Sequence, residues 1–101
     1  MAYWSIIGTA KSGTPKNFGI TLDTVAETWT VGGPAAARLF KSKSGKFDFH
    51  VLPTIGTTLV NAGGKIVARL DGLTATSAIG ATGSGHQEET AEFFDWKLDS
   101  K

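Results

Sequence analysis

The 101-residue sequence has no cysteine, three prolines, no long apolar run and almost no net charge. Without cysteine, neither a disulfide nor a thiolate metal site can stabilise the fold. No apolar run approaches the ~20 residues of a membrane-spanning helix. The first residues also lack the basic start and apolar h-region of a signal peptide. These absences predict a chain that is made in the cytoplasm, folds under reducing conditions and has no membrane as a partner.

The net charge of +1 argues against non-specific binding to nucleic acid or anionic lipid. The charges are, however, unevenly distributed. Residues 1–87 contain eight Lys or Arg and four Asp or Glu, whereas residues 88–101 contain five acids and two lysines. Solubilising charges on a turn and an exposed end would explain this split. A contact between the basic part of one copy and the acidic end of another would explain it as well.

Alternation of polar and apolar residues is clearest at residues 46–51. Successive strand side chains point to opposite faces, so Phe47, Phe49 and Val51 are predicted to share a buried face. Residues 38–41 are expected as an incoming strand and residues 42–45 as a turn. A hairpin is therefore predicted over residues 38–52, ended by Pro53.

A second hairpin is predicted from Thr57–Val60 and Lys65–Asp71. The turn between them contains Gly63 and Gly64, which adopt the positive φ of a tight reversal without strain. Strand alternation places Ile66, Ala68 and Leu70 on one buried face.

The remaining chain is rich in strand-type residues. Strands are expected at residues 3–10, 18–25 and 28–31, and a weak edge strand at residues 73–79. The alanines at 35–37 are too few to nucleate a helix and are interpreted as the approach to the first hairpin. The sequence Gly-Ala-Thr-Gly-Ser-Gly at residues 80–85 is predicted to be a mobile loop.

Residues 87–98 fit either a helix or a strand. As a helix, the glutamates would favour its N-terminal end. As a strand, Phe94, Trp96 and Leu98 would share one face, and the aromatic content and the surrounding strands favour this alternative. With it, the chain has eight or nine short strands. This number predicts an all-β protein whose residues 1–101 form one antiparallel β-sandwich, of immunoglobulin-like or jelly-roll type, with a small barrel as the alternative.

Candidate reactive groups are few. Asp48 and His50 share a strand face, but a metal site needs three or four ligands, and the other histidine, His86, lies beside Glu88 and Glu89 near the predicted loop. No nucleophile with an identifiable base is present, and the glycine run lacks the lysine and the strand-to-helix context of a phosphate loop. The sequence therefore predicts no enzyme, with no catalytic, cofactor-binding or metal-binding residue.

Trp4, Trp29 and Trp96 each alternate with apolar residues and are predicted to be core. Of the aromatic residues considered for stacking a sugar, only Tyr3 is expected at the surface. A carbohydrate- or other ligand-binding module is thus the second functional hypothesis.

The first hypothesis is a non-enzymatic structural or assembly protein that forms a homo-oligomer or joins a larger protein array, such as a decoration or minor coat protein of a phage virion. This hypothesis rests on the absence of catalytic motifs and on the uneven distribution of charge. The predicted partner-binding residues are Arg38, Lys41, Lys43, Lys46, Glu88, Glu89, Glu92 and Asp95.

Overall fold

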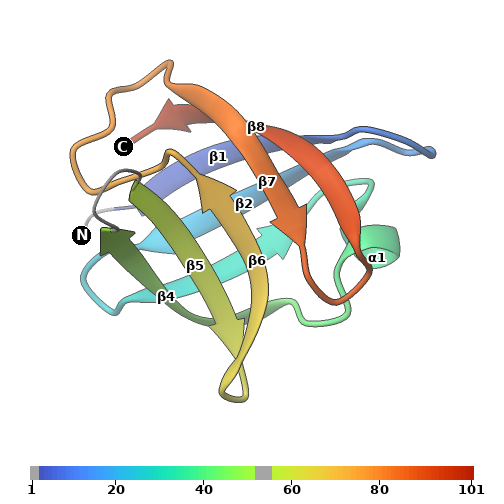
Figure 1. Cartoon of the computed structure of the whole chain (residues 1–101), viewed down its shortest axis with the longest axis horizontal. Coiled ribbons are helices and arrows are strands. Elements are labelled where there is room, and N and C mark those ends of the chain that lie inside the picture. Colours follow the sequence, from blue (N-terminus) through green and yellow to red (C-terminus); the bar gives the residue numbers. More distant parts are fainter. Residues whose placement is uncertain (1–2, 52–55) are drawn as a thin grey trace.

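The computed structural model describes residues 3–51 and 56–101, apart from the side chains of His50 and Val51. Its strands follow one another in chain order around a closed barrel (Figure 1). They are β1 (Tyr3–Ala10), β2 (Asn17–Asp23), β3 (Thr28–Gly32), β4 (Ser44–Val51), β5 (Gly56–Ala62), β6 (Lys65–Asp71), β7 (Thr82–Gln87) and β8 (Glu92–Ser100).

The barrel closes because the first and last strands pair. β1 and β8 are antiparallel, and Ile6 lies opposite Leu98 while Ala10 lies opposite Phe94. Each strand is thus paired with a neighbour on both sides in the described part of the chain, although the β3–β4 pairing covers only residues 28–30 and 44–46. The predicted β-sandwich is therefore wrong. Strand alternation is the same in a sandwich and in a barrel, and only this pairing between distant strands separates the two.

Aromatic rings fill the inside of the barrel. Trp29, Phe94 and Trp96 are almost fully buried. Two of these rings lie opposite glycines on β7: Phe94 pairs with Gly85, and Trp96 with Gly83. A methyl group on Gly83 would lie 2.6 Å from the Trp96 ring, so the glycines leave the space that the rings occupy.

This packing corrects the prediction of a mobile loop at residues 80–85. Residues 82–87 instead form β7, which is hydrogen-bonded to β6 and β8. The glycine-rich segment has few apolar side chains of its own to bury. It pairs with β6 and β8, which do bury apolar side chains. The weak edge strand expected at residues 73–79 is also absent: this described segment connects β6 to β7.

The second hairpin is confirmed as β5 and β6, with positive φ at Gly63 and Gly64. The predicted face of β6 is partly wrong, because the pairing shifts between Val60 and Asn61. This bulge leaves Val67 and Ala68 both buried and Ile66 46% exposed.

The first hairpin is not formed as predicted. Residues 36–39 make one turn of helix, α1 (Ala36–Leu39), and β4 begins only at Ser44, where it pairs with β3 and β5. Tertiary packing forms this short helix, since Ala36 and Leu39 are buried. Phe47 is buried and Phe49 is half-buried against Trp4, whereas the predicted burial of Val51 and the stop at Pro53 lie outside the described parts.

Residues 92–100 form β8, which confirms the strand interpretation of the C-terminal segment. Phe94, Trp96 and Leu98 are buried together, as predicted, and Trp4 and Trp29 are core residues too. The neighbouring Phe93 points outward and is 60% exposed.

Candidate functional site

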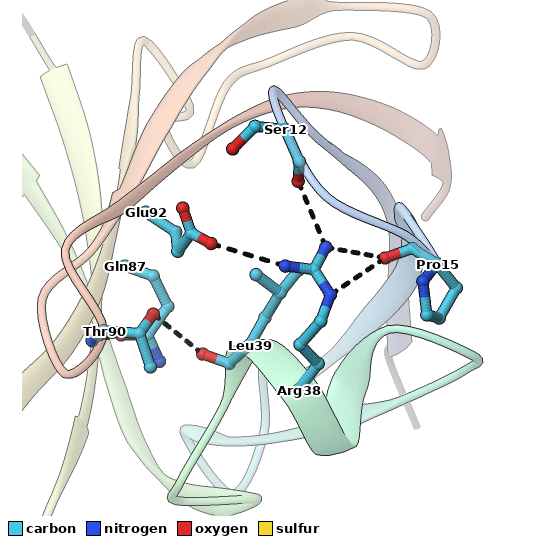
Figure 2. A network of polar contacts seen from close by, with 7 residues as sticks. All are labelled: Ser12, Pro15, Arg38, Leu39, Gln87, Thr90 and Glu92. Carbon is cyan, nitrogen blue, oxygen red and sulfur yellow. Dashed lines mark hydrogen bonds and ion pairs between the residues drawn. The ribbon is translucent and has the colours of Figure 1, made fainter.

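Helix α1 closes one end of the barrel, and Arg38 ties it to two other elements (Figure 2). The guanidinium donates to the carbonyl oxygens of Ser12 and Pro15 in the β1–β2 loop, at 3.2 and 2.7 Å. It also pairs with Glu92 at the start of β8, at 3.3 Å. In the β7–β8 turn, the Thr90 hydroxyl donates a hydrogen bond to the Leu39 carbonyl at 3.2 Å. The β7–β8 turn and the β1–β2 loop are thus fixed against α1.

Glu89 makes a second tie at the same end. One carboxylate oxygen accepts hydrogen bonds from the backbone N–H groups of Lys41 and Ser42, at 3.0 and 3.1 Å, and the other accepts from the Ser42 hydroxyl at 2.7 Å. The side-chain amide of Gln87, which is fully buried, donates to the same carboxylate at 2.9 Å. The α1–β4 connection is therefore held to the β7–β8 turn.

These contacts set the acidity of Glu89. Burial acts to raise the pKa of the carboxyl, but hydrogen bonds from the Ser42 side chain, the Gln87 side chain and the backbone of Ser42 and Lys41 outweigh it. The net result is a pKa below the ordinary value, because the donors stabilise the ionised form. Glu89 is thus a negatively charged group whose oxygens are occupied within the fold.

Most of the predicted partner-binding side chains have contacts within their own chain. Arg38 pairs with Glu92, and the ammonium of Lys43 donates to the carbonyl of Phe40. Asp95 pairs with Lys11 at 3.0 Å. Glu88 contacts both Arg69 and His86, at 3.2 and 2.8 Å. The basic segment and the acidic end therefore meet in one molecule, and a contact between copies stays a prediction.

Three connections surround a pocket of about 340 Å³ at this end of the barrel, here called the end pocket. The α1–β4 connection, the β5–β6 hairpin and the β7–β8 turn all contribute to it. Its lining residues are Lys41, Ser42, Ala62, Lys65, Ile66, Val67, Glu88 and Glu89. Three of the predicted partner-binding residues, Lys41, Glu88 and Glu89, thus lie around one hollow, whereas Lys46 is exposed on β4.

The charged side chains of the end pocket differ in their contacts. Glu88 is ion-paired with Arg69, and Glu89 keeps its negative charge while its oxygens accept hydrogen bonds from neutral donors. No carboxylate of the described residues lies within 4.0 Å of the ammonium of Lys41 or Lys65, and both side chains are exposed. Beside them, Ile66 is 46% exposed. The end pocket therefore offers two cations and one apolar side chain to a ligand.

The sequence predicted three of the eight residues that line this pocket. Lys41 was included because basic residues cluster around it. Lys65 and Ile66 were missed, since strict alternation on β6 would bury Ile66, and the bulge opposite it cannot be inferred from residue types. The Gly63–Gly64 turn before Lys65 was a usable signal, because side chains next to a hairpin turn are commonly exposed.

Within residues 3–51 and 56–101, no three His, Cys, Asp or Glu side chains are grouped to hold a metal ion. His86 is engaged with Glu88, and the side chain of His50 lies outside the described part, so the Asp48–His50 pair is not tested. No helix in this part is long and apolar enough to cross a membrane.

No protein-family model, curated protein or solved structure shows significant similarity to this chain. The virion and capsid role expected from the sequence thus has no support from relatives.

Proposed function

We propose that this protein is a non-enzymatic binding module that holds a partner protein in the end pocket. The partner contributes a segment in which an acidic residue stands next to an apolar one. Its carboxylate pairs with Lys41 or Lys65, and its apolar side chain packs on Ile66. The observation that supports this proposal is a pair of lysines that have no carboxylate partner among the described side chains and that lie beside an exposed isoleucine.

The construction of the barrel supports a role for its end rather than its inside. Aromatic side chains occupy the interior, so the chain presents its loops and outer wall to a ligand. The mouth of a barrel is a common position for binding sites. The hydrogen bonds around Glu89 hold the α1–β4 connection in place, so little conformational entropy is lost when a partner binds.

Exposed ion pairs contribute only ~0 to 1 kcal/mol each, so the lysines chiefly select and orient the segment. Burial of the isoleucine and of the partner's apolar group supplies the larger part of the affinity. Binding is therefore expected to weaken, but not to disappear, as the salt concentration rises.

A phage-displayed library of random peptides, selected on the immobilised protein, tests this function. We expect enriched sequences with Asp or Glu beside an apolar residue. The synthetic peptides should bind the double variant Lys41→Glu, Lys65→Glu at least about tenfold more weakly than the wild type. The matched control, Lys16→Glu with Lys46→Glu, makes the same charge change on exposed lysines outside the pocket. Equal loss in both variants, or no enrichment at all, would contradict the proposal.

A further inference from the structure

The outer wall of the barrel presents an aromatic ring to solvent. Phe93, on β8, is 60% exposed. His86, its cross-strand neighbour on β7, packs against it with a distance of 4.5 Å between ring centroids and an angle of 51° between the ring planes. The phenyl ring is thus supported by the histidine and still leaves much of its surface uncovered.

Polar groups surround the ring on both sides. Towards β6, His86 Nδ1 lies 2.8 Å from Glu88 Oε1, and the same oxygen lies 3.2 Å from Arg69 Nε. Towards β1, the backbone N–H of Lys11 donates to the Phe93 carbonyl at 3.0 Å. The Lys11 ammonium lies 3.0 Å from Asp95. We call this surface the Phe93 shelf. It comprises Lys11, Arg69, His86, Glu88, Phe93 and Asp95.

The shelf carries no excess charge. Its two ion pairs each balance, and their side chains are 37% to 58% exposed, so they remain hydrated. A nucleic acid or another polyanion finds no net positive field here. A protein partner would have to desolvate both ion pairs, which costs more than their attraction returns in many interfaces. The shelf suits a neutral ligand that leaves these charges partly in water.

We propose that the Phe93 shelf binds a neutral sugar. One face of a pyranose ring consists mainly of C–H groups and packs on the negative face of the phenyl ring. Its hydroxyl groups take the places of water at the Glu88 and Asp95 carboxylates and at the Arg69 guanidinium. Hydroxyls both donate and accept, so they match this mixture of acceptors and donors.

This site is independent of the end pocket. Glu88 contacts both surfaces, but Phe93, Arg69 and Asp95 do not line the pocket, and Lys41, Lys65 and Ile66 do not belong to the shelf. Loss of one function would therefore leave the other testable.

The test is a titration of the ¹⁵N-labelled full chain with neutral hexasaccharides of glucose, mannose, xylose and N-acetylglucosamine, followed by two-dimensional NMR. We expect at least one of these probes to shift the resonances of Phe93, His86 and Arg69. Phe93→Ala should weaken that binding by about tenfold or more, and Phe93→Tyr should retain it. Tyr3→Ala removes an exposed aromatic residue on β1, which is not part of the shelf, and this variant should bind as the wild type does.

Failure takes three recognisable forms. The proposal is overturned if no hexasaccharide shifts shelf resonances, if Phe93→Ala binds as well as the wild type, or if only the acidic peptides selected for the end pocket cause the shifts. A Phe93→Ala protein that has lost its fold would show it in the dispersion of its own spectrum. Asp95→Ala, at a residue that does not line the end pocket, then replaces it as the test variant, with weaker binding expected because a carboxylate acceptor is lost.

Discussion

At the scale of single residues, the barrel interior depends on glycines that stand opposite aromatic rings. Besides the two on β7, Gly8 on β1 lies opposite Phe18 on β2. Trp96 also donates from its indole nitrogen to the carbonyls of Asp71 and Ser84, at 3.0 and 3.1 Å. The ring is therefore fixed by both packing and hydrogen bonds, and it cannot move aside without loss.

Gly83→Ala is expected to destabilise the protein by about 1–3 kcal/mol, the usual range for overpacking a core. The added methyl group would lie 2.6 Å from both the Trp96 ring and the Asp71 carbonyl oxygen. Gly32→Ala is the matched control, because a methyl group there meets nothing within 4 Å. It should change the free energy of unfolding by no more than about 0.5 kcal/mol. Urea denaturation measures the free energy of unfolding of both variants. Equal effects would show that the Trp96 ring moves aside easily to make room for the methyl group.

Residue patterns predicted the core better than they predicted the exposed surface. Phe94, Trp96 and Leu98 were assigned to one buried face because alternation is local and needs no knowledge of the partner strands. Ile66 was not recognised as exposed, because the bulge that turns it outward depends on how β5 meets β6. Alternation does place Phe93 on the face of β8 opposite Phe94 and Trp96, and Phe93 is 60% exposed there.

At the scale of elements, the fold relies on side chains that join connections far apart in sequence. Glu89, in the β7–β8 turn, accepts hydrogen bonds from the α1–β4 connection 47 and 48 residues earlier. These connections also line the end pocket, so the same carboxylate that stabilises the barrel end positions Lys41.

Glu89→Gln should lower the free energy of unfolding by about 1–3 kcal/mol at pH 7, because the backbone donors of Lys41 and Ser42 lose a charged acceptor. The folded pKa of Glu89 lies below the ordinary value of 4.5, so its contribution is fully present above pH 4.5 and is lost as the pH falls through the folded pKa. Denaturation of both proteins between pH 7 and pH 3 measures this. A difference that stays constant below pH 4.5 would contradict the assignment.

Elements could be predicted where the residues themselves favoured strands, as in β1, β5, β6 and β8. The two missed elements are formed by their surroundings. α1 is a single turn that is stable because Ala36 and Leu39 are buried, and β7 is a glycine-rich strand that fits beside Phe94 and Trp96. Neither has a local propensity that a pattern could reveal.

At the scale of the whole molecule, closure of the barrel decides how stability is distributed. A sandwich would leave edge strands with unpaired N–H and C=O groups, and the weakest strands would open first. In this chain β1 and β8 pair over residues 5–10 and 94–100. Each strand then opens only at the expense of two neighbours. Strand order and closure could not be predicted from the sequence, because this pairing joins the two ends of the chain and leaves no local signal.

Closure predicts that β7 is protected from hydrogen exchange despite its glycines. The backbone amides of residues 83–87 that bond to β6 or β8 should exchange as slowly as those of β2, since both strands lie between two paired neighbours. Amides of Ala75, Thr76, Ala78 and Ile79, in the segment that connects β6 to β7, serve as the control and should exchange much faster. Thr74 and Ser77 are left out of the control because their amides donate hydrogen bonds within this segment. Hydrogen exchange followed by NMR on the free protein measures all three segments. If residues 83–87 exchange as fast as the control amides, β7 opens independently, and the barrel behaves in solution as an open sheet with edges at β6 and β8.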